Sequence, residues 1–531
     1  MKKVLSLLLA ICLIVSLLAA CGGNKSGDPV ENNKAEASKD KYRDYYQVWI
    51  GSFCDSNNDK IGDLPGVLSK LDYINDGDPN GGNDLGADGI WLSPMMPSQS
   101  YHKYNVRDYF DIDPDFGTLE DFDKLLTACH DRGVKVIIDL VLNHSGNDHE
   151  FFVKAGQELR EGKEDGYARY YNVSKTQDST YNRPVLGSDY YYEGQFDTTM
   201  PDWNLSYQGT RDYFEKVTKF WLDRGVDGFR LDAIKHFEDK DTDGVEFMKW
   251  FYQMAQGYNP DVYMVGENWS ESGDIYEMYD SGIDSQFNFK FAGNGGEFIV
   301  ASHGNVADMA TKLKKFDDNI KKHNEKAINA NFLSNHDMLR LYSMLDEEDN
   351  KMAAALYMLA PGNTFTYYGE EIGIEAPSSN GDANYRTAMI WDNENLPDIK
   401  FQGSPAVQKN ELGGVEQQLS QEHSLLNTYR KLIKIRLQNP DIARGSIEKV
   451  VDFEDPMCTG LLINHDNSRV LVVHNGGKEA KELTIDAIEK PELRGWVIAD
   501  KAESPSEETP KLSDTKLSIP ARTSVVLKEK K

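Results

Sequence analysis

Three acidic residues stand where short, largely apolar segments of the chain give way to polar residues: Asp232, Glu267 and Asp337. Such segments predict buried strands. A carboxylate at the carboxyl end of a buried strand points into the mouth of a barrel, where a substrate can reach it. Glycosidic bonds are usually cut by two such acids, one ionised and one protonated. The pattern therefore indicates sugar chemistry.

The segments that must position these acids alternate between predicted strands and helices. Amphipathic stretches such as 119–132 and 211–224 predict helices, and each ends in an Asp-Arg-Gly-Val sequence whose Gly suits a helix C-terminus. Several strand segments are near-continuous apolar runs, as expected for parallel strands covered on both faces. The predicted strands are 47–50, 89–92, 134–141, 228–232, 263–267, 285–289, 330–333 and 364–368.

Eight strands joined in this way predict a (β/α)8 TIM barrel, formed by residues 42–143 and 208–440. An open doubly wound sheet is the alternative, but no Gly-rich phosphate loop follows the first strand. The tyrosine-rich segment 144–207 is too long for a structureless connection, so we expect a small inserted domain after the third strand. Alternating β-rich runs at 460–464, 469–474, 482–485 and 523–528 predict a C-terminal antiparallel β-sandwich over residues 441–531.

The first residues predict a targeting segment. Lys2 and Lys3 precede an apolar run that ends at residue 20, which is typical of a signal peptide. The end of this run resembles a bacterial lipobox, which implies cleavage before Cys21 and lipidation of its thiol. Residues 21–41 then predict a flexible tether. We expect an extracellular lipoprotein that meets the membrane only through this anchor; a plain signal peptide is the alternative.

Charge and cysteine usage argue against nucleic acid binding, a disulfide framework and a Cys-based metal site. The formal net charge of -29 makes nucleic acid a poor partner, because its phosphates would be repelled. Beyond the targeting segment only Cys54, Cys129 and Cys458 remain, an odd and scattered set. They indicate neither a disulfide framework nor a Cys-based metal site.

Four segments resemble, in order and spacing, the four sequence regions of the α-amylase family of glycoside hydrolases. They are 139–144, 228–236, 266–268 and 332–337. The resemblance implies that Asp232 is the nucleophile, Glu267 the general acid/base, and Asp337 the residue that holds sugar hydroxyls and stabilises the transition state.

The resemblance also implies contacts with the sugar. Arg230 lies two residues before Asp232 on the same predicted strand, so both side chains face the same way and the guanidinium favours the ionised carboxylate. The family's positions at the cleavage subsite correspond to Tyr104, His144, Arg230 and His336. Lys235 and His236 match positions on the leaving-group side, and Arg386 is a further candidate for substrate contact.

A loop after the first strand has oxygen-bearing side chains at every second position. Such a loop can wrap around a hard cation, although Lys60 and Gly66 exclude an EF-hand. The family resemblance implies a structural Ca²⁺ there, and a solvated turn rich in Asp and Asn is the alternative. The implied ligands are Asp55, Asn57, Asp59, Asp63 and the carbonyl of Ile61.

The segment 200–204 resembles the branch of the family that lies between oligo-1,6-glucosidases and neopullulanases, with Trp203 as a departure from its usual form. The segment 101–104 lacks the acid that exo-acting relatives carry three residues before the stacking tyrosine. We therefore expect a retaining, endo-acting α-amylase that cuts internal α-1,4 bonds of starch and maltooligosaccharides. Neopullulanase, oligo-1,6-glucosidase or α-glucosidase activity is the alternative, and a non-catalytic sugar-binding lipoprotein is a second one.

Overall fold

The computed structural model describes residues 39–529 except 79–80, 239–242, 271–272, 380, 402–404, 467, 486–495 and 503–508. The predicted signal peptide, Cys21 and most of the predicted tether lie outside these residues. Within the part of the chain that is described, no helix is long and apolar enough to cross a membrane.

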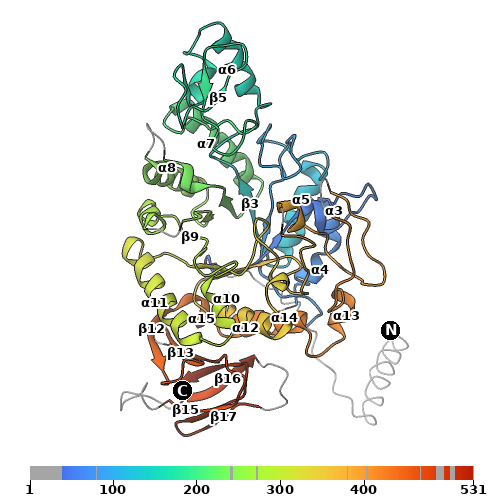
Figure 1. Ribbon diagram of the computed structural model, residues 1–531, viewed down its shortest axis with the longest axis vertical. Coiled ribbons are helices and arrows are strands. Elements are labelled where there is room, and N and C mark those ends of the chain that lie inside the picture. The colour runs from blue at the N-terminus through green and yellow to red at the C-terminus, as the bar shows by residue number, and fades with distance from the viewer. Residues whose placement is uncertain are drawn as a thin grey trace, which may run out of the picture.

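Eight parallel strands form one nearly closed sheet, which confirms the predicted (β/α)8 barrel (Figure 1). The sheet order is β10-β11-β1-β2-β3-β7-β8-β9, and a parallel bridge between Phe287 and Ala330 joins its two edges. The strands are β1 (Asp44–Val48), β2 (Gly89–Leu92), β3 (Lys135–Leu140), β7 (Gly228–Leu231), β8 (Tyr263–Gly266), β9 (Ser285–Gln286), β10 (Ala330–Phe332) and β11 (Asn363–Tyr367).

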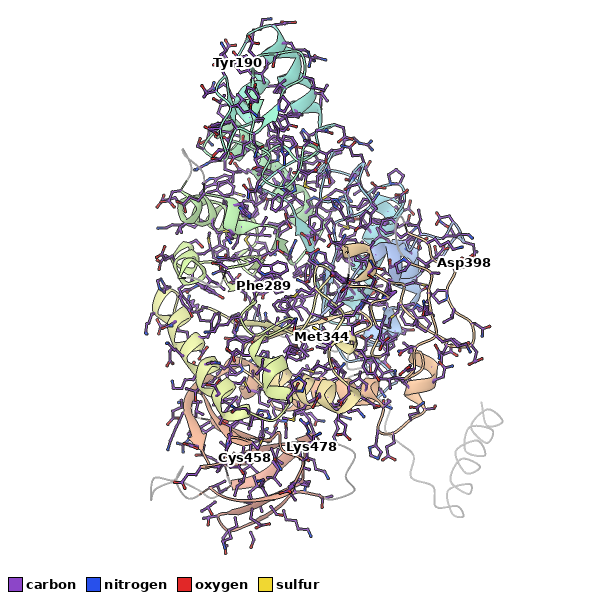
Figure 2. The ribbon with its side chains drawn as sticks, viewed as in Figure 1. Tyr190, Phe289, Met344, Asp398, Cys458 and Lys478 are labelled. Carbon is purple, nitrogen blue, oxygen red and sulfur yellow. The ribbon has the colours of Figure 1, made fainter. Side chains whose placement is uncertain are left out.

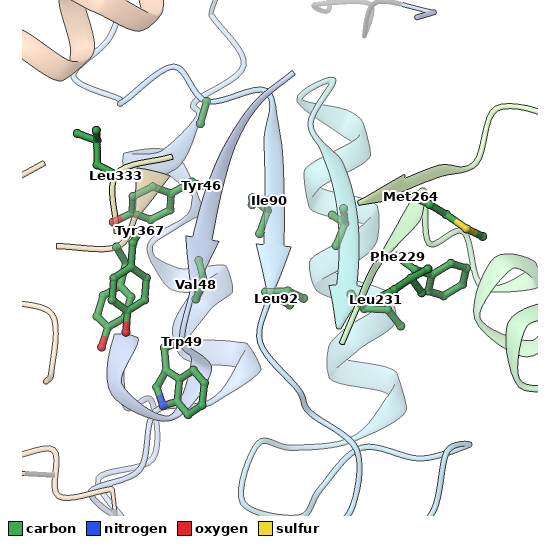
Figure 3. Close-up of a cluster of buried hydrophobic side chains, with 14 of the residues drawn as sticks. Tyr46, Val48, Trp49, Ile90, Leu92, Phe229, Leu231, Met264, Leu333 and Tyr367 are labelled. Atoms are coloured by element: carbon green, nitrogen blue, oxygen red, sulfur yellow. The ribbon is translucent and has the colours of Figure 1, made fainter. Parts of the chain in front are cut away.

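Side chains alternate between the two faces of these strands. Val48, Ile90 and Leu231 belong to the large apolar layer outside the barrel (Figure 3). The longer helices that follow the barrel strands are α5 (Leu119–Asp131), α7 (Gln208–Asp223), α8 (Gly244–Tyr258), α11 (Val306–His323), α12 (Glu347–Met358) and α14 (Leu425–Gln438). The barrel interior is a second cluster rich in aromatic rings, with Tyr45, Trp91, Tyr263, Phe287, Phe332 and Phe365 among its members.

The first predicted strand ends earlier than expected. Residues Ile50–Phe53 form a short helix, α2, although the sequence pattern predicts strand at 47–50. All four residues of α2 are buried. Gly51 lies so close to the Phe401 ring that an added Cβ would fall 2.6 Å from it, so packing at the barrel mouth overrides the strand propensity of Ile50.

Two further units flank the barrel. Between β3 and α7 the chain forms α6 (Glu150–Arg160), the 3₁₀ helix η1 (Tyr167–Tyr170) and a sheet of three two-residue strands, β4 (Val173–Ser174), β6 (Tyr191–Tyr192) and β5 (Arg183–Pro184). This unit projects at one end of the molecule and carries Tyr190 (Figure 2). Trp203 is buried beneath it and stacks on Tyr171, with ring centroids 4.6 Å apart.

The C-terminal residues form two antiparallel sheets with a small apolar core that includes Cys458, at the opposite end of the molecule (Figure 2). One sheet contains β12 (Ser446–Asp452), β13 (Cys458–His465), β14 (Ser468–Asn475), β19 (Thr523–Glu529) and β16 (Trp496–Ala502). The other contains β15 (Lys481–Thr484), β18 (Lys516–Ile519) and β17 (Lys511–Ser513). Predicted strands at 460–464, 469–474, 482–485 and 523–528 lie within or overlap these elements.

The chain enters the barrel at the amino end of β1. Lys41, three residues before this strand, pairs with Asp284 at 2.9 Å and donates to the Tyr252 hydroxyl at 3.2 Å. Asp284 precedes β9, so this contact lies at the amino ends of the strands. Asp232, Glu267 and Asp337 follow the carboxyl ends of β7, β8 and β10, at the other end of the barrel.

Candidate active site

The guanidinium of Arg230 is the centre of the acidic cluster at the barrel mouth. Its Nη1 lies 2.8 Å from Asp232 Oδ1, and its Nη2 lies 3.1 Å from Glu267 Oε2. The Arg230 side chain is fully buried. Because both carboxylates bind one rigid guanidinium fork, their positions relative to each other are fixed.

The turn after β7 provides a second contact for Glu267. Ala233 has the left-handed backbone angle φ 51°, which is unusual for a residue with a Cβ. In this conformation its N–H donates to Glu267 Oε2 at 3.0 Å. Strained backbone of this kind persists where the surrounding structure enforces it, often at functional sites.

Burial raises the pKa of both Asp232 and Glu267, the carboxyl groups that contact Arg230 from the ends of β7 and β8. Burial raises the pKa of Glu267 to about 7; Arg230 opposes this rise, while Asp232 and Asp337 add to it. Burial also raises the pKa of Asp232, and the opposing effect of Arg230, although expected from the sequence, is the smaller of the two. A carboxyl group that titrates near neutral pH can both donate and accept a proton.

Asp337 has the opposite environment. Its Oδ1 accepts from Arg386 Nη2 at 2.6 Å, and its Oδ2 lies 3.0 Å from His336 Nε2. Although burial alone would raise the pKa of Asp337, these contacts hold it well below its usual range. Asp337 is thus a permanent anion that can accept hydrogen bonds from sugar hydroxyls. Arg386, the further candidate for substrate contact, belongs to the site through its ion pair with this carboxylate.

Tyr104 and His144 line the same region. Tyr104 is 8% exposed, and its hydroxyl lies 3.2 Å from Arg230 Nη1 and 2.6 Å from His336 Nε2. Burial lowers the pKa of His144 to about 3, so its imidazole is neutral at physiological pH. Its buried Nε2 has no hydrogen-bond partner among the described residues, so it can bind a sugar hydroxyl.

Lys235 and His236 lie farther out, on the 3₁₀ helix η2 (Ile234–His236) that follows β7. Lys235 Nζ donates to the carbonyl of Trp269 at 3.2 Å. The His236 ring lies 5.2 Å from Phe196, a residue of the unit between β3 and α7. Both residues therefore lie at the outer edge of the active site, whereas Asp232 and Arg230 lie at its bottom.

Four residues of the site were not singled out from the sequence. Asp139 pairs with Arg230 Nη1 at 2.8 Å, and Gln47 lies 2.8 Å from His336 Nδ1. Trp269 is 46% exposed and stacks on Phe289, and Phe196 is 45% exposed with its ring 5.2 Å from His144. Asp139 opens one of the recognised motifs and Trp269 lies two residues after Glu267, so both had a local signal. Gln47 and Phe196 had none.

The loop predicted to bind calcium is compact and largely exposed. Asp55 Oδ2 accepts from the N–H of Lys60 at 2.8 Å, and Asp59 Oδ1 accepts from that of Ile61 at 2.8 Å. Asn58 and Lys60 adopt left-handed φ values of 65° and 79°, which wrap the loop tightly. No group of three or more His, Cys, Asp or Glu side chains suited to a metal occurs in the described chain. The three aspartates of the implied ligand set, Asp55, Asp59 and Asp63, therefore do not form such a group; their carboxylates accept hydrogen bonds from neighbouring residues of the loop.

Comparison with known proteins identifies the family. The family described as "Alpha amylase, catalytic domain" matches residues 47–445. Alpha-amylase 3 of Dictyoglomus thermophilum is 34% identical over 81% of this chain and 84% of its own length. An oligo-1,6-glucosidase of Bacillus cereus is 27% identical over 81% of this chain and 89% of its own.

Solved structures agree with these sequence relatives. Amy13B of Eubacterium rectale has a TM-score of 0.85 at 34% identity, and it covers 93% of this chain and 97% of its own. An α-amylase from H. orenii has a TM-score of 0.80 at 34% identity, and the match covers 92% of this chain and 100% of the H. orenii chain. The protein is therefore a member of the α-amylase catalytic domain family and a glycoside hydrolase.

Proposed function

We propose that the protein is a retaining, endo-acting α-amylase that hydrolyses internal α-1,4 bonds of starch and maltooligosaccharides. The observation that carries this proposal is the pair Asp232 and Glu267 on one buried guanidinium, with the pKa of Glu267 near 7. Double displacement at a sugar requires two neighbouring carboxyl groups, one that attacks as a carboxylate and one that titrates near neutral pH and can donate and accept a proton.

In the first step an Asp232 carboxylate oxygen attacks the anomeric carbon, and the bond to the glycosidic oxygen breaks as Glu267 transfers its proton to that oxygen. The products are a glycosyl ester on Asp232 and a shortened glucan. In the second step Glu267, now ionised, takes a proton from water while the water oxygen attacks the anomeric carbon. Asp232 leaves as a carboxylate and Glu267 regains its proton. Two inversions give net retention.

Asp337 and the neutral imidazole of His144 would hold the sugar ring during both steps, while His336, which is fully buried against Asp337, would support that carboxylate. Hydrogen bonds to hydroxyl groups that strengthen as charge develops lower the barrier, because they act in a buried site. Arg230 stays charged throughout and limits how far the two carboxylates repel each other.

Two observations support endo-cleavage of α-1,4 bonds over the alternatives. The residue three positions before Tyr104 is Tyr101, whose hydroxyl accepts from Arg386 at 2.8 Å, so no carboxylate stands there to bind a terminal sugar. Two of the similar proteins, from Dictyoglomus thermophilum and H. orenii, are named α-amylases. Other similar proteins are named oligo-1,6-glucosidase and probable alpha-glucosidase, so the test must also distinguish these activities.

The test is a product profile over time on starch, pullulan, maltotriose and isomaltose. An endo-acting α-amylase gives a mixture of maltooligosaccharides from starch at the earliest times, with new reducing ends in the α configuration by NMR. Glucose as the first and only product would refute endo-cleavage, and hydrolysis of isomaltose in preference to maltotriose would favour the 1,6-glucosidase. A protein that binds these sugars and cleaves none would be a sugar-binding lipoprotein.

Calcium and lipidation belong to the same proposal. Asp55, Asn57, Asp59, Asp63 and the Ile61 carbonyl would hold a structural Ca²⁺ through hard oxygen donors, and the ion would brace the loop after α2.

Lipidation of Cys21 would place the enzyme on the outer surface of the cell, where starch, which cannot enter, is accessible. A Cys21→Ser variant recovered in the medium while the natural chain pellets with membranes is the expected result for the anchor.

A further inference from the structure

The buried imidazole of His336 is held from both sides by groups whose hydrogen-bonding roles differ. His336 is fully buried, and Gln47, on β1, is 1% exposed. Gln47 Nε2 lies 2.8 Å from His336 Nδ1, while Asp337 Oδ2 and the Tyr104 hydroxyl lie 3.0 Å and 2.6 Å from His336 Nε2. A neutral imidazole has one N–H and one acceptor nitrogen, so these neighbours decide which nitrogen carries the proton.

The Nε2 side requires a donor. Asp337 is held as a carboxylate and can only accept a hydrogen bond. The Tyr104 hydroxyl accepts from Arg230 Nη1 at 3.2 Å and lies 3.2 Å from Asp139 Oδ2, to which it donates its single proton. Toward His336 it can therefore only accept. Both neighbours of Nε2 thus face an N–H.

The Nδ1 side then requires an acceptor, because the ring is neutral. Burial lowers the pKa of His336, and Arg386 and Arg230 disfavour a positive charge; the opposing effect of Asp337 is smaller than that of burial. His102, whose charge would also act on His336, is itself neutral because burial lowers its pKa to about 4. The Gln47 amide NH₂ is the donor that meets Nδ1.

We propose that Gln47 is a positioning residue that fixes His336 as the neutral Nε2–H tautomer. The hydrogen bonds then run in one direction: Gln47 donates to Nδ1, and Nε2–H donates to the Tyr104 and Asp337 oxygens. The partner on one ring nitrogen commonly sets the role of the other. Gln47 thereby keeps an N–H aimed at Asp337 without placing a second cation beside Arg386. The functional part of this inference rests on the proposed glycoside hydrolysis.

Neutron diffraction from crystals exchanged into D₂O tests the proton position directly and needs no turnover. The expected result is deuterium on His336 Nε2 and none on Nδ1, with the Gln47 amide nitrogen toward the ring. Deuterium on Nδ1 alone would overturn the proposal. Deuterium on both nitrogens, with the Gln47 oxygen toward the ring, would also overturn it.

Kinetics test the consequence. We expect Gln47→Leu to lower kcat on maltooligosaccharides about tenfold with a much smaller change in KM, since one buried hydrogen bond to a group of the reaction is lost. Gln47→Glu keeps the shape but offers an acceptor; it should raise the pKa of His336 and shift the pH profile of kcat. The matched control is Gln418→Leu, because Gln418 is equally buried but bonds the main chain at Ile372 and Gly413, away from the acids.

Rates are expressed per active site, titrated with a slow glycosyl fluoride that accumulates the ester on Asp232, so that loss of folded protein does not mimic loss of turnover. An unchanged kcat per site in Gln47→Leu, or an equal loss in Gln418→Leu, would overturn the inference. A natural enzyme that cleaves no α-glucan would instead refute the proposed function and leave the neutron result to decide the tautomer.

Discussion

Replacing Glu267 by Gln tests the division of labour between the two carboxyl groups. At its ordinary pKa of 4.5 a glutamic acid would be protonated in only about 0.3% of molecules at pH 7, whereas a pKa of about 7 protonates roughly half of them. Burial at the barrel mouth therefore increases the amount of competent acid by about 150-fold. The substituted amide has the same shape and keeps the contacts with Arg230 and Ala233 within reach, but it has no acidic proton to give.

For Glu267→Gln we expect kcat/KM on maltooligosaccharides to fall by about 10²- to 10⁴-fold, the usual contribution of a general acid. An α-maltosyl fluoride should be affected much less in the formation of the ester, because fluoride leaves without protonation. The natural enzyme should lose kcat/KM as the pH rises through about 7, and the variant should lack this limb when assayed on the fluoride.

The control for this experiment is Asp232→Asn, which should lose activity on both substrates because the attacking oxygen is gone. An equal loss on the fluoride and on maltooligosaccharides in Glu267→Gln would refute the assignment of the acid. So would an alkaline limb with the same midpoint in the variant, because that limb would then belong to another group.

Binding, stability and metal dependence give four more expected outcomes. Asp232→Asn should bind maltooligosaccharides in calorimetry with near-natural affinity and leave them uncut; hydrolysis at the natural rate would remove Asp232 from its role. The folded pKa values of Asp139, about 7, and Glu370, about 8, lie above their unfolded values, so the stability they contribute is complete below about pH 4 and is lost as the pH rises through 7 to 8. The Tm should accordingly fall across this range and fall less in Glu370→Gln; a Tm that is flat or rises with pH would contradict this. A chelator should lower the Tm of the natural protein, added Ca²⁺ should restore it, and Asp59→Asn should respond less; no response in the natural protein would argue for a solvated turn. Trp203→Ala should cost about 3–5 kcal/mol of unfolding free energy, measured by urea denaturation, because it removes a fully buried ring; a loss under about 1 kcal/mol would show that the site collapses around the change.

Most of the barrel could be predicted from the sequence because its strands are buried on both faces and therefore apolar along their length. β2 has the predicted bounds, and the other barrel strands differ mainly at their ends. The sequence pattern does not predict strand β12. Its pairing with β13 shifts register between Ile447 and Lys449, so the bulge breaks the alternation of apolar and polar residues on which such a prediction depends.

Some residues of the candidate site could likewise be predicted from the sequence, and others could not. Asp232, Glu267 and Asp337 could be selected because carboxylates interrupt apolar strands and recur in ordered motifs. Gln47 could not, since an amide inside a short strand has no distinctive spacing and acquires its role only when β1 meets the loop after β10. Trp203 shows the converse. It stands out from the sequence because it departs from the usual motif, but its ring packs on Tyr171 beneath the inserted unit and its indole N–H donates to the Tyr109 hydroxyl at 3.3 Å.

The entry of the chain at the amino end of β1, fastened by Lys41 to Asp284, has a consequence for how the enzyme would stand on a cell. With lipid on Cys21, the amino ends of the barrel strands would face the bilayer and the catalytic opening would face the medium. A coil-like tether of about 20 residues, as the sequence predicts, would have a root-mean-square span of roughly 25 Å, which would keep the amino end of the barrel near the lipid surface while leaving the body free to tilt. A granule or a long glucan could then approach from the medium without having to pass between the enzyme and the lipid surface.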